Sequence, residues 1–259
     1  MTFNTITYTT DQGITNITLN RPDRYNAFNE EMRSELLAAM EAAGADKGCR
    51  VIVLSGSGKA FSSGQDLKDI EGKKINFSGF LKKGYNPVIR SMRNMPKPII
   101  CKLNGVAAGA GCSLALACDY IIAHDQASLV EVFVGIGLVL DSGSSYFLPR
   151  LVGSARAFEL ATMGSKVSAT KAAEWGMINA VVSVDELEEE TNIVARYYAN
   201  APTLAVGMMK KMLNDSMSSS LEEVLEYEAH YQQLAGDSTD YTEGVAAFIE
   251  KRKPKFTGS

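Results

Sequence analysis

The chain has 259 residues, enough for one large hydrophobic core or for a core with an appended helical region. Hydrophobic residues make up 46% and charged residues 22%, as in ordinary globular proteins, and no apolar run reaches the ~20 residues of a membrane span. The net charge of −4 argues against a nucleic-acid-binding protein, which needs a basic face.

The N-terminal half predicts strands and helices in alternation. The first residues lack the basic and apolar stretches of a secretory signal, so we expect a cytoplasmic protein. A hairpin is predicted first, with its turn at Asp11–Gly13, and Asn29 is placed to cap the helix that follows. The further expected elements are strands over 50–56 and 97–105, a Gly/Ser loop over 56–66, and helices starting at 67 and spanning 85–95.

The same order of strand, glycine turn and helix then recurs between residues 97 and 153, which indicates an α/β core. From Asp185 the chain becomes almost wholly helical. We place a boundary near residues 200–202, giving a core over 1–200 and a helical C-terminal region over 201–259. Met208, Met209 and Met212 fall at helical spacing in that region and predict packing or subunit contacts.

The chemistry available to the chain is limited. Its four cysteines form no C-x-x-C pair and are expected to be buried, reduced thiols. His124 and His230 lie far apart without ligand spacing, so neither a zinc site nor a Ser-His-Asp triad is expected. Catalysis, if present, must therefore use carboxylates and backbone groups, without a metal or a separate cofactor.

Two glycine-rich stretches join strands to helices. "GSGKAFSSG" fails the Walker A pattern at Val53 and Ala60, and "GAGCSL" fails the dinucleotide pattern at Leu114. The junctions "FSSGQD" and "GVAAGAGC" allow close backbone approach, and their free amides could form an oxyanion hole. Tight packing of helix on sheet explains either stretch equally well.

A single carboxylate, Asp141, follows the apolar run in "GIGLVLDSGSSYFLPR". A buried charge is costly unless it is paired or neutralised, so an acid at this position indicates a functional or structural role. One reading makes Asp141 an acid/base whose pKa is raised by its apolar approach. The other makes it the cap of a helix that begins at Ser142.

"FSSGQDL", "LNGVAAGAGCSLALACD" and "GIGLVLDSGSSYFLPRLVG" together resemble the enoyl-CoA hydratase/isomerase (crotonase) superfamily. The resemblance extends to "LNRPDRYNAFN" and "SATKAAEWGMINAVV" and so covers nearly the whole chain. The tail "YQQLAGDSTDYTEGVAAFIEKRKPKFTG" is similar to the branch that isomerises ring epoxides in phenylacetate catabolism. The resemblance implies an α/β spiral of ββα turns, a helical C-terminal trimerisation region, and a homotrimer or dimer of trimers.

The resemblance also implies a coenzyme A thioester as the substrate. The amides of Gln65 and Ala110 would hold the thioester oxygen, and Asp141 would be the acid/base. Phe248 and Lys251 would reach the CoA of a neighbouring subunit. The remaining positions implied to bind substrate or CoA are Arg24, Tyr25, Asn26, Ala27, Ser63, Gly64, Asp66, Leu67, Gly109 and Phe133.

The carboxylates favour one reaction within the family. Ser113 and Phe133 stand where a hydratase of this family has two glutamates, which favours an isomerase over an enoyl-CoA hydratase. Glu131 is two residues from the second position and remains a possible stand-in. Leu140 replaces a proline common before the acid, from which we expect a looser turn at Asp141.

Three alternatives stay open. An enoyl-CoA hydratase is the nearest, and a non-catalytic partner subunit is the one from another class. A dehalogenase of the superfamily also uses an aspartate here, but it pairs that acid with a tryptophan at the position of Phe133. The acyl group is open as well, although Phe77, Phe80 and Tyr85 are consistent with a ring-containing substrate.

Overall fold

The computed structural model describes residues 2–259. Its strands alternate with helices up to residue 182, as the sequence predicts. The strands are β1 (Ile6–Asp11), β2 (Ile14–Leu19), β3 (Val51–Gly56), β4 (Ala60–Ser62), β5 (Ile99–Leu103), β6 (Val106–Ala108), β7 (Tyr120–His124), β8 (Ser128–Val130), β9 (Val167–Ser168) and β10 (Ala180–Val182).

The helices cover the sheets and then continue alone to the C-terminus. The α-helices are α1 (Glu30–Ala45), α2 (Leu67–Ile70), α3 (Phe77–Phe80), α4 (Asn86–Asn94), α5 (Ala110–Leu116), α6 (Ser144–Val152), α7 (Ser154–Met163), α8 (Ala169–Glu174), α9 (Leu187–Ala199), α10 (Thr203–Ser216), α11 (Leu221–Gly236) and α12 (Thr239–Glu250). Shorter helical turns are η1 (Pro22–Arg24), η2 (Leu81–Tyr85) and η3 (Val132–Ile136).

The strands form two sheets that the chain visits in turn. The larger sheet has the order β1-β2-β3-β5-β7-β10 and is parallel except for the β1–β2 hairpin. The smaller sheet has the order β4-β6-β8-β9. The pairs β3/β4, β5/β6 and β7/β8 each place one strand in each sheet before a helix follows, which confirms the predicted ββα spiral.

Local signals in the sequence account for several element ends. Gln12 and Gly13 both have positive φ, 48° and 83°, as a tight hairpin turn requires. The Asn29 side chain accepts the N–H of Met32 at 2.9 Å, so its predicted role as the cap of α1 is confirmed. Helix α4 ends at Asn94, just before Pro96, because proline cannot continue a helix.

The large sheet is buried on both faces. In β3, Ile52 and Leu54 join the main core beneath α1 and α4, whereas Val51 and Val53 pack against α9 in a second apolar cluster. This two-sided burial explains why β3 reads as a continuous apolar run instead of an alternating one. Helix α9 therefore belongs to the core.

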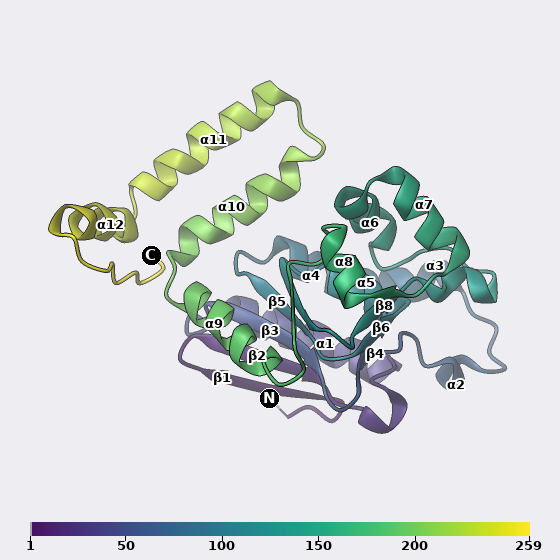
Figure 1. The fold of residues 1–259 in the computed structure, drawn as a ribbon. Helices are drawn as coiled ribbons and strands as arrows, with labels where there is room; N and C mark the ends of the chain where they lie inside the picture. Colours follow the sequence, from purple (N-terminus) through teal and green to yellow (C-terminus); the bar gives the residue numbers. More distant parts are fainter. Residues whose placement is uncertain (1) are drawn as a thin grey trace.

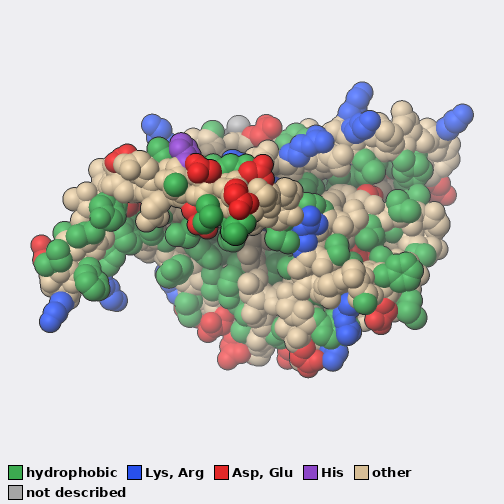
Figure 2. Space-filling model, turned by 90° about the horizontal axis from the view of Figure 1, so that it is seen from above, with side chains coloured by type: hydrophobic (Ala, Val, Ile, Leu, Met, Phe, Trp, Pro, Cys, Tyr) green, Lys and Arg blue, Asp and Glu red, His purple; other side chains and the backbone are tan. Residues whose placement is uncertain are grey.

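After α9 the chain turns away from the sheets at residues 200–202. Helices α10, α11 and α12 extend from the body as an arm (Figure 1). The arm stays attached through Lys210 on α10, whose Nζ donates to Met92 O at 2.8 Å and to Asp119 Oδ2 at 2.6 Å. Hydrophobic side chains are exposed along the arm (Figure 2), among them Met209, Leu213, Met217, Leu221, Leu225, Leu234 and Phe248.

None of the helices formed by residues 2–259 has both the length and the apolar composition needed to cross a bilayer.

Candidate active site

The two glycine-rich junctions meet in space. A Cβ added to Gly64 would lie 2.7 Å from the carbonyl oxygen of Ala108 and 3.4 Å from the amide nitrogen of Ala110. Gly64 has φ of 87° and Gly109 has φ of 52°, conformations that other residues rarely adopt. Glycine at both positions therefore lets the backbones of Gln65 and Ala110 approach each other.

A β-bridge between Phe28 and Gln65 orients the Gln65 amide toward the Gly109 loop. Phe28 N–H donates to Gly64 O at 2.8 Å, and Asp66 N–H donates to Phe28 O at 3.0 Å. Successive amides of an extended chain point to opposite sides, so the N–H of Gln65 points away from Phe28. Within residues 2–259 this amide meets no acceptor.

The Ala110 amide is free for a different reason. Ala110 is the first residue of α5, and the first amides of a helix have no intrahelical acceptor. Its neighbour Gly109 is held by donation to Val130 O at 2.9 Å, and Gly109 O accepts from Ser113 N–H at 2.9 Å. The second loop is thus anchored on β8 and on its own helix, while the N–H of Ala110 remains available.

The segments expected to hold CoA also lie together. Ser63 N–H donates to Tyr25 O at 2.9 Å, and Arg21 forms an ion pair of 3.0 Å with Asp66. Tyr25 and Leu67 expose more than half of their surfaces, 57% and 53%, beside this junction. The structure therefore brings the implied residues Arg24, Tyr25, Ser63, Asp66 and Leu67 to one surface, while Ala27 is buried.

Asn26 is completely buried, unlike Tyr25 before it. Its Nδ2 donates to Ser57 O and Ala60 O at 2.9 and 2.8 Å, and its Oδ1 accepts from Arg21 N–H at 2.9 Å. Asn26 supports the loop from inside, which leaves direct contact with a ligand to the residues around it.

The Gln65 side chain belongs to a polar cluster that sequence reasoning missed. Its Oε1 accepts from Arg33 Nη1 and from the Tyr85 hydroxyl, both at 2.8 Å. The Arg33 guanidinium also lies 4.4 Å from the ring centre of Phe80. The buried Arg33 sits in α1 between apolar positions, so its burial carried no sequence signal.

Asp141 lies in the turn before α6, half-buried. Burial raises the pKa of its carboxyl, and the Ser142 hydroxyl, which donates to Asp141 Oδ1 at 2.7 Å, partly offsets that rise. The Asp141 charge also contributes to the raised pKa of Tyr85, after the larger effect of burial. Tyr85 is therefore influenced by the Asp141 charge and also donates to the Gln65 side chain.

The alternative that makes Asp141 a helix cap is wrong. Helix α6 begins at Ser144 with Gly143 as its cap, and no side chain caps it. Asp141 contributes only its carbonyl, which accepts from Ser144 N–H at 3.0 Å. Ser142 has φ of 51° and Gly143 has φ of 86°, so the turn adds two left-handed residues before the helix can start.

The two positions where a hydratase would carry glutamates hold no acid. Ser113 is completely buried, and its hydroxyl donates to Gly109 O at 3.2 Å. Phe133 is buried against Gly109, where an added Cβ would lie 3.8 Å from the phenyl ring. Both side chains therefore support the Gly109 loop.

A second carboxyl nevertheless lies close to Asp141. Glu131 is only 2% exposed, and burial raises its pKa to about 7, with a further contribution from the Asp141 charge. The Ser144 hydroxyl donates to its Oε1, while Oε2 has no hydrogen-bond partner. The sequence marked Glu131 because it lies two residues from Phe133, the position of the second hydratase glutamate. Nothing in the sequence predicted that Glu131 would be buried.

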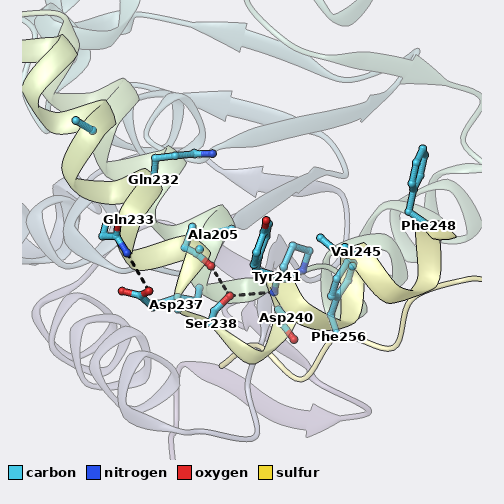
Figure 3. Close-up of a pocket in the computed structure, with 16 residues that line it drawn as sticks. Ala205, Gln232, Gln233, Asp237, Ser238, Asp240, Tyr241, Val245, Phe248 and Phe256 are labelled. Carbon is cyan, nitrogen blue, oxygen red and sulfur yellow. Dashed lines mark hydrogen bonds between the residues drawn. The ribbon is translucent and has the colours of Figure 1, made fainter.

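Away from this site, a hollow of about 770 Å³ lies between α10, α11 and α12 (Figure 3). Phe248 is 85% exposed beside it, and Ser238 caps α12 by accepting from Tyr241 N–H at 3.1 Å. Phe248 and Lys251 thus lie on the arm and not beside Asp141. The four cysteines are buried and free, as predicted.

Comparison with known proteins agrees with this geometry. The enoyl-CoA hydratase/isomerase family model matches residues 9–259. The chain is 42% identical over 252 residues to the 1,2-epoxyphenylacetyl-CoA isomerase of Escherichia coli, covering 96% of each chain. It is 41% identical over 258 residues to a Rhodobacter capsulatus protein named "Probable enoyl-CoA hydratase", covering all of both.

A solved structure shows the same fold. The enoyl-CoA hydratase of Bacillus anthracis superposes with a TM-score of 0.95 at 31% identity, covering 99% of this chain and 100% of the other. Sequence and structure therefore agree over the core and the helical arm alike. The chain belongs to the enoyl-CoA hydratase/isomerase (crotonase) family of enzymes that act on CoA thioesters.

Proposed function

We propose that the chain is an isomerase of acyl-CoA thioesters in which Asp141 is the single acid/base. The observation that carries this proposal is the pair of free amides at Gln65 and Ala110, which the close approach of Gly64 to the second loop brings together, beside the half-buried Asp141 whose pKa is raised. Ser113 and Phe133 stand at the two positions where a hydratase of the family has glutamates, so neither position supplies a carboxyl to this site.

The amides would hold the thioester oxygen as negative charge develops on it. Two preorganised N–H donors stabilise such an enolate because their positions are set before the reaction begins. Asp141 would remove a proton from the carbon next to the thioester and return it elsewhere on the same substrate. One base is enough for a transfer within one molecule, and its raised pKa brings its proton affinity closer to working pH.

For the acyl group we propose a ring 1,2-epoxide of phenylacetyl-CoA, opened to an oxepin, with an enoyl double-bond shift as the related reaction. The similarity to the Escherichia coli isomerase supports this choice. CoA then belongs to the substrate, and the mechanism needs no separate cofactor.

We propose a homotrimer or a dimer of trimers as the assembly. The exposed hydrophobic side chains of the arm support this assignment, because a surface of that kind favours burial against another subunit. Phe248 on α12 and Lys251, which follows that helix, would then reach the CoA of the neighbouring subunit.

A product assay tests the function. The purified protein would be offered the ring-epoxide, a 3-enoyl and a 2-enoyl CoA ester, each in water labelled with ¹⁸O. We expect isomers without label from the first two esters. A labelled 3-hydroxyacyl product as the main outcome would contradict the proposal.

An enoyl-CoA hydratase is the second candidate, and one observation favours it. Glu131 and Asp141 form a pair of neighbouring carboxyls, as water addition requires. The 2% exposure of Glu131 argues against it, since that carboxyl is not open to a water molecule. The labelled product of the same assay separates the two reactions, and any turnover excludes a non-catalytic partner subunit.

A further inference from the structure

Glu131 is a buried acid without a positive partner. It follows β8 and lies beneath the turn that carries Asp141, with 2% of its surface exposed. Among residues 2–259, no lysine or arginine forms an ion pair with it. Ionising a carboxyl in such a place is costly because neither water nor a cation compensates the charge.

The groups around Glu131 act on its charge in both directions. Burial has the largest effect and raises its pKa, and the Asp141 charge in the turn before α6 raises it further, whereas the Ser144 hydroxyl and the buried Cys112 thiol of α5 partly offset the rise. From the end of α7, Gly164 approaches the Glu131 backbone and brings no side chain. The one hydrogen bond to the carboxyl comes from Ser144, while Oε2 is buried and unpartnered. A protonated carboxyl fits these surroundings better than an anion.

Ser144 connects this carboxyl to the acid/base. It is the first residue of α6, it is completely buried, and its amide donates to the carbonyl of Asp141 at 3.0 Å. Its hydroxyl donates to Glu131. The turn from Asp141 to Ser144 is therefore hydrogen-bonded, at Ser144, to the side chain of Glu131, which directly follows β8. This attachment holds the turn without the proline that Leu140 replaces.

Building on the isomerase function proposed above, we infer that Glu131 is a positioning residue, which as a neutral acid anchors Ser144 and so aims Asp141 at the substrate. It transfers no proton itself. A charge on Glu131 would repel the Asp141 carboxylate and disturb the turn, so the productive enzyme keeps this proton.

The test compares Glu131→Gln with Glu131→Ala in the full-length protein, using the CoA ester that the wild type turns over. Glutamine imitates the neutral acid, keeps the acceptor for Ser144 and cannot ionise. We expect E131Q to keep kcat within about threefold at pH 6 and to lose the decline in kcat/KM that the wild type shows above pH 7. We expect E131A to lose about tenfold to a hundredfold in kcat at every pH with little change in KM, because a misaimed base slows chemistry more than binding.

Ser144→Ala serves if E131A does not fold, since it removes the same hydrogen bond and leaves Glu131 in place. A fall in its kcat with unchanged KM supports the inference. Loss of activity in E131Q as large as in E131A would overturn it, because Glu131 would then transfer a proton. Wild-type kcat in both E131A and S144A would overturn it as well. These outcomes differ from the result that would overturn the proposed function. That result is turnover by Asp141→Asn near the wild-type rate.

Discussion

The two halves of the candidate site use different chemical groups. The half formed by Gln65 and Ala110 uses backbone amides, held by a bridge to Phe28 and by the start of α5. The half formed by Asp141 uses a side chain, whose carboxyl accepts from the Ser142 hydroxyl and whose backbone carbonyl accepts from the Ser144 amide. The first half depends on where the backbone runs, whereas the second depends on which side chains surround one carboxyl.

This difference predicts opposite tolerance to substitution. The amide half should accept a changed side chain that leaves the backbone in place, and it should fail when an N–H is lost or a Cβ is added at a glycine. The carboxyl half should respond to single hydroxyls and carboxyls, and above all to pH.

Replacing Ala110 with proline gives the largest expected effect on the amide half. Proline is tolerated at the first helical position, so α5 should form, and a ring carbon replaces the N–H that would face the substrate. We expect kcat to fall about 10²–10³-fold, the usual cost of one lost oxyanion donor. Ala110→Gly keeps the amide and is the matched control. Equal activity in A110P and A110G would show that this amide does not act on the substrate.

Glu131→Gln should change how stability depends on pH in the carboxyl half. Since burial raises the folded-state pKa of Glu131 from 4.5 to about 7, the wild type should lose stability as pH rises between these values. The full loss is about 3 kcal/mol, at ~1.4 kcal/mol for each pKa unit, and glutamine does not incur it. Urea unfolding at pH 4.5 and pH 8 should show E131Q gaining that amount relative to the wild type. A difference that does not vary with pH would contradict the raised pKa.

Gly64→Ala should destabilise the fold by about 2 kcal/mol. The new Cβ would lie 2.7 Å from Ala108 O, and the residue would have to keep φ of 87°. Gly236→Ala is the control, because nothing lies within 4 Å of its Cβ position in α11. Thermal unfolding should lower the Tm of G64A and leave that of G236A unchanged or higher. Equal values would mean that the two loops can separate without cost.

Ser142 gives the smallest expected effect. Ser142→Ala and Ser142→Gly both remove the hydroxyl that donates to Asp141, so both should raise the pKa of Asp141 and move the acid limb of kcat/KM to higher pH. Glycine also relieves the left-handed conformation at φ of 51°, so S142G should be about 1 kcal/mol more stable than S142A. An unmoved acid limb would show that this hydroxyl does not act on Asp141.

The sequence predicted the elements well because their signals are local. Asn29 as a cap, the turn at Gln12–Gly13 and the end of α4 before Pro96 each depend on neighbouring residues alone. The residues alone left the meeting of the Gly64 and Gly109 loops as one of two equal readings, and the resemblance favoured it, since no local pattern places residues 45 positions apart together. The structure then supplied the close approach that explains both glycines.

The missed features all come from tertiary burial. Nothing in the sequence indicated the burial of Arg33, and the sequence marked Glu131 only as a neighbour of a family position, whereas packing encloses both. Asp141 looked able to cap a helix at Ser142 because the left-handed conformation of Ser142 could not be read from its residue type. Side-chain environments of this kind depend on elements far apart in the chain.

The role of Asp141 is tested most directly by Asp141→Asn, assayed for product and for binding of the CoA ester in ¹⁸O-labelled water. Asparagine keeps the size of the side chain but cannot act as a base. We predict that the wild type forms an unlabelled isomer and that D141N loses about 10²–10⁴-fold in kcat while ester binding survives. Turnover by D141N near the wild-type rate, or a labelled hydroxyacyl product from the wild type, would contradict the account.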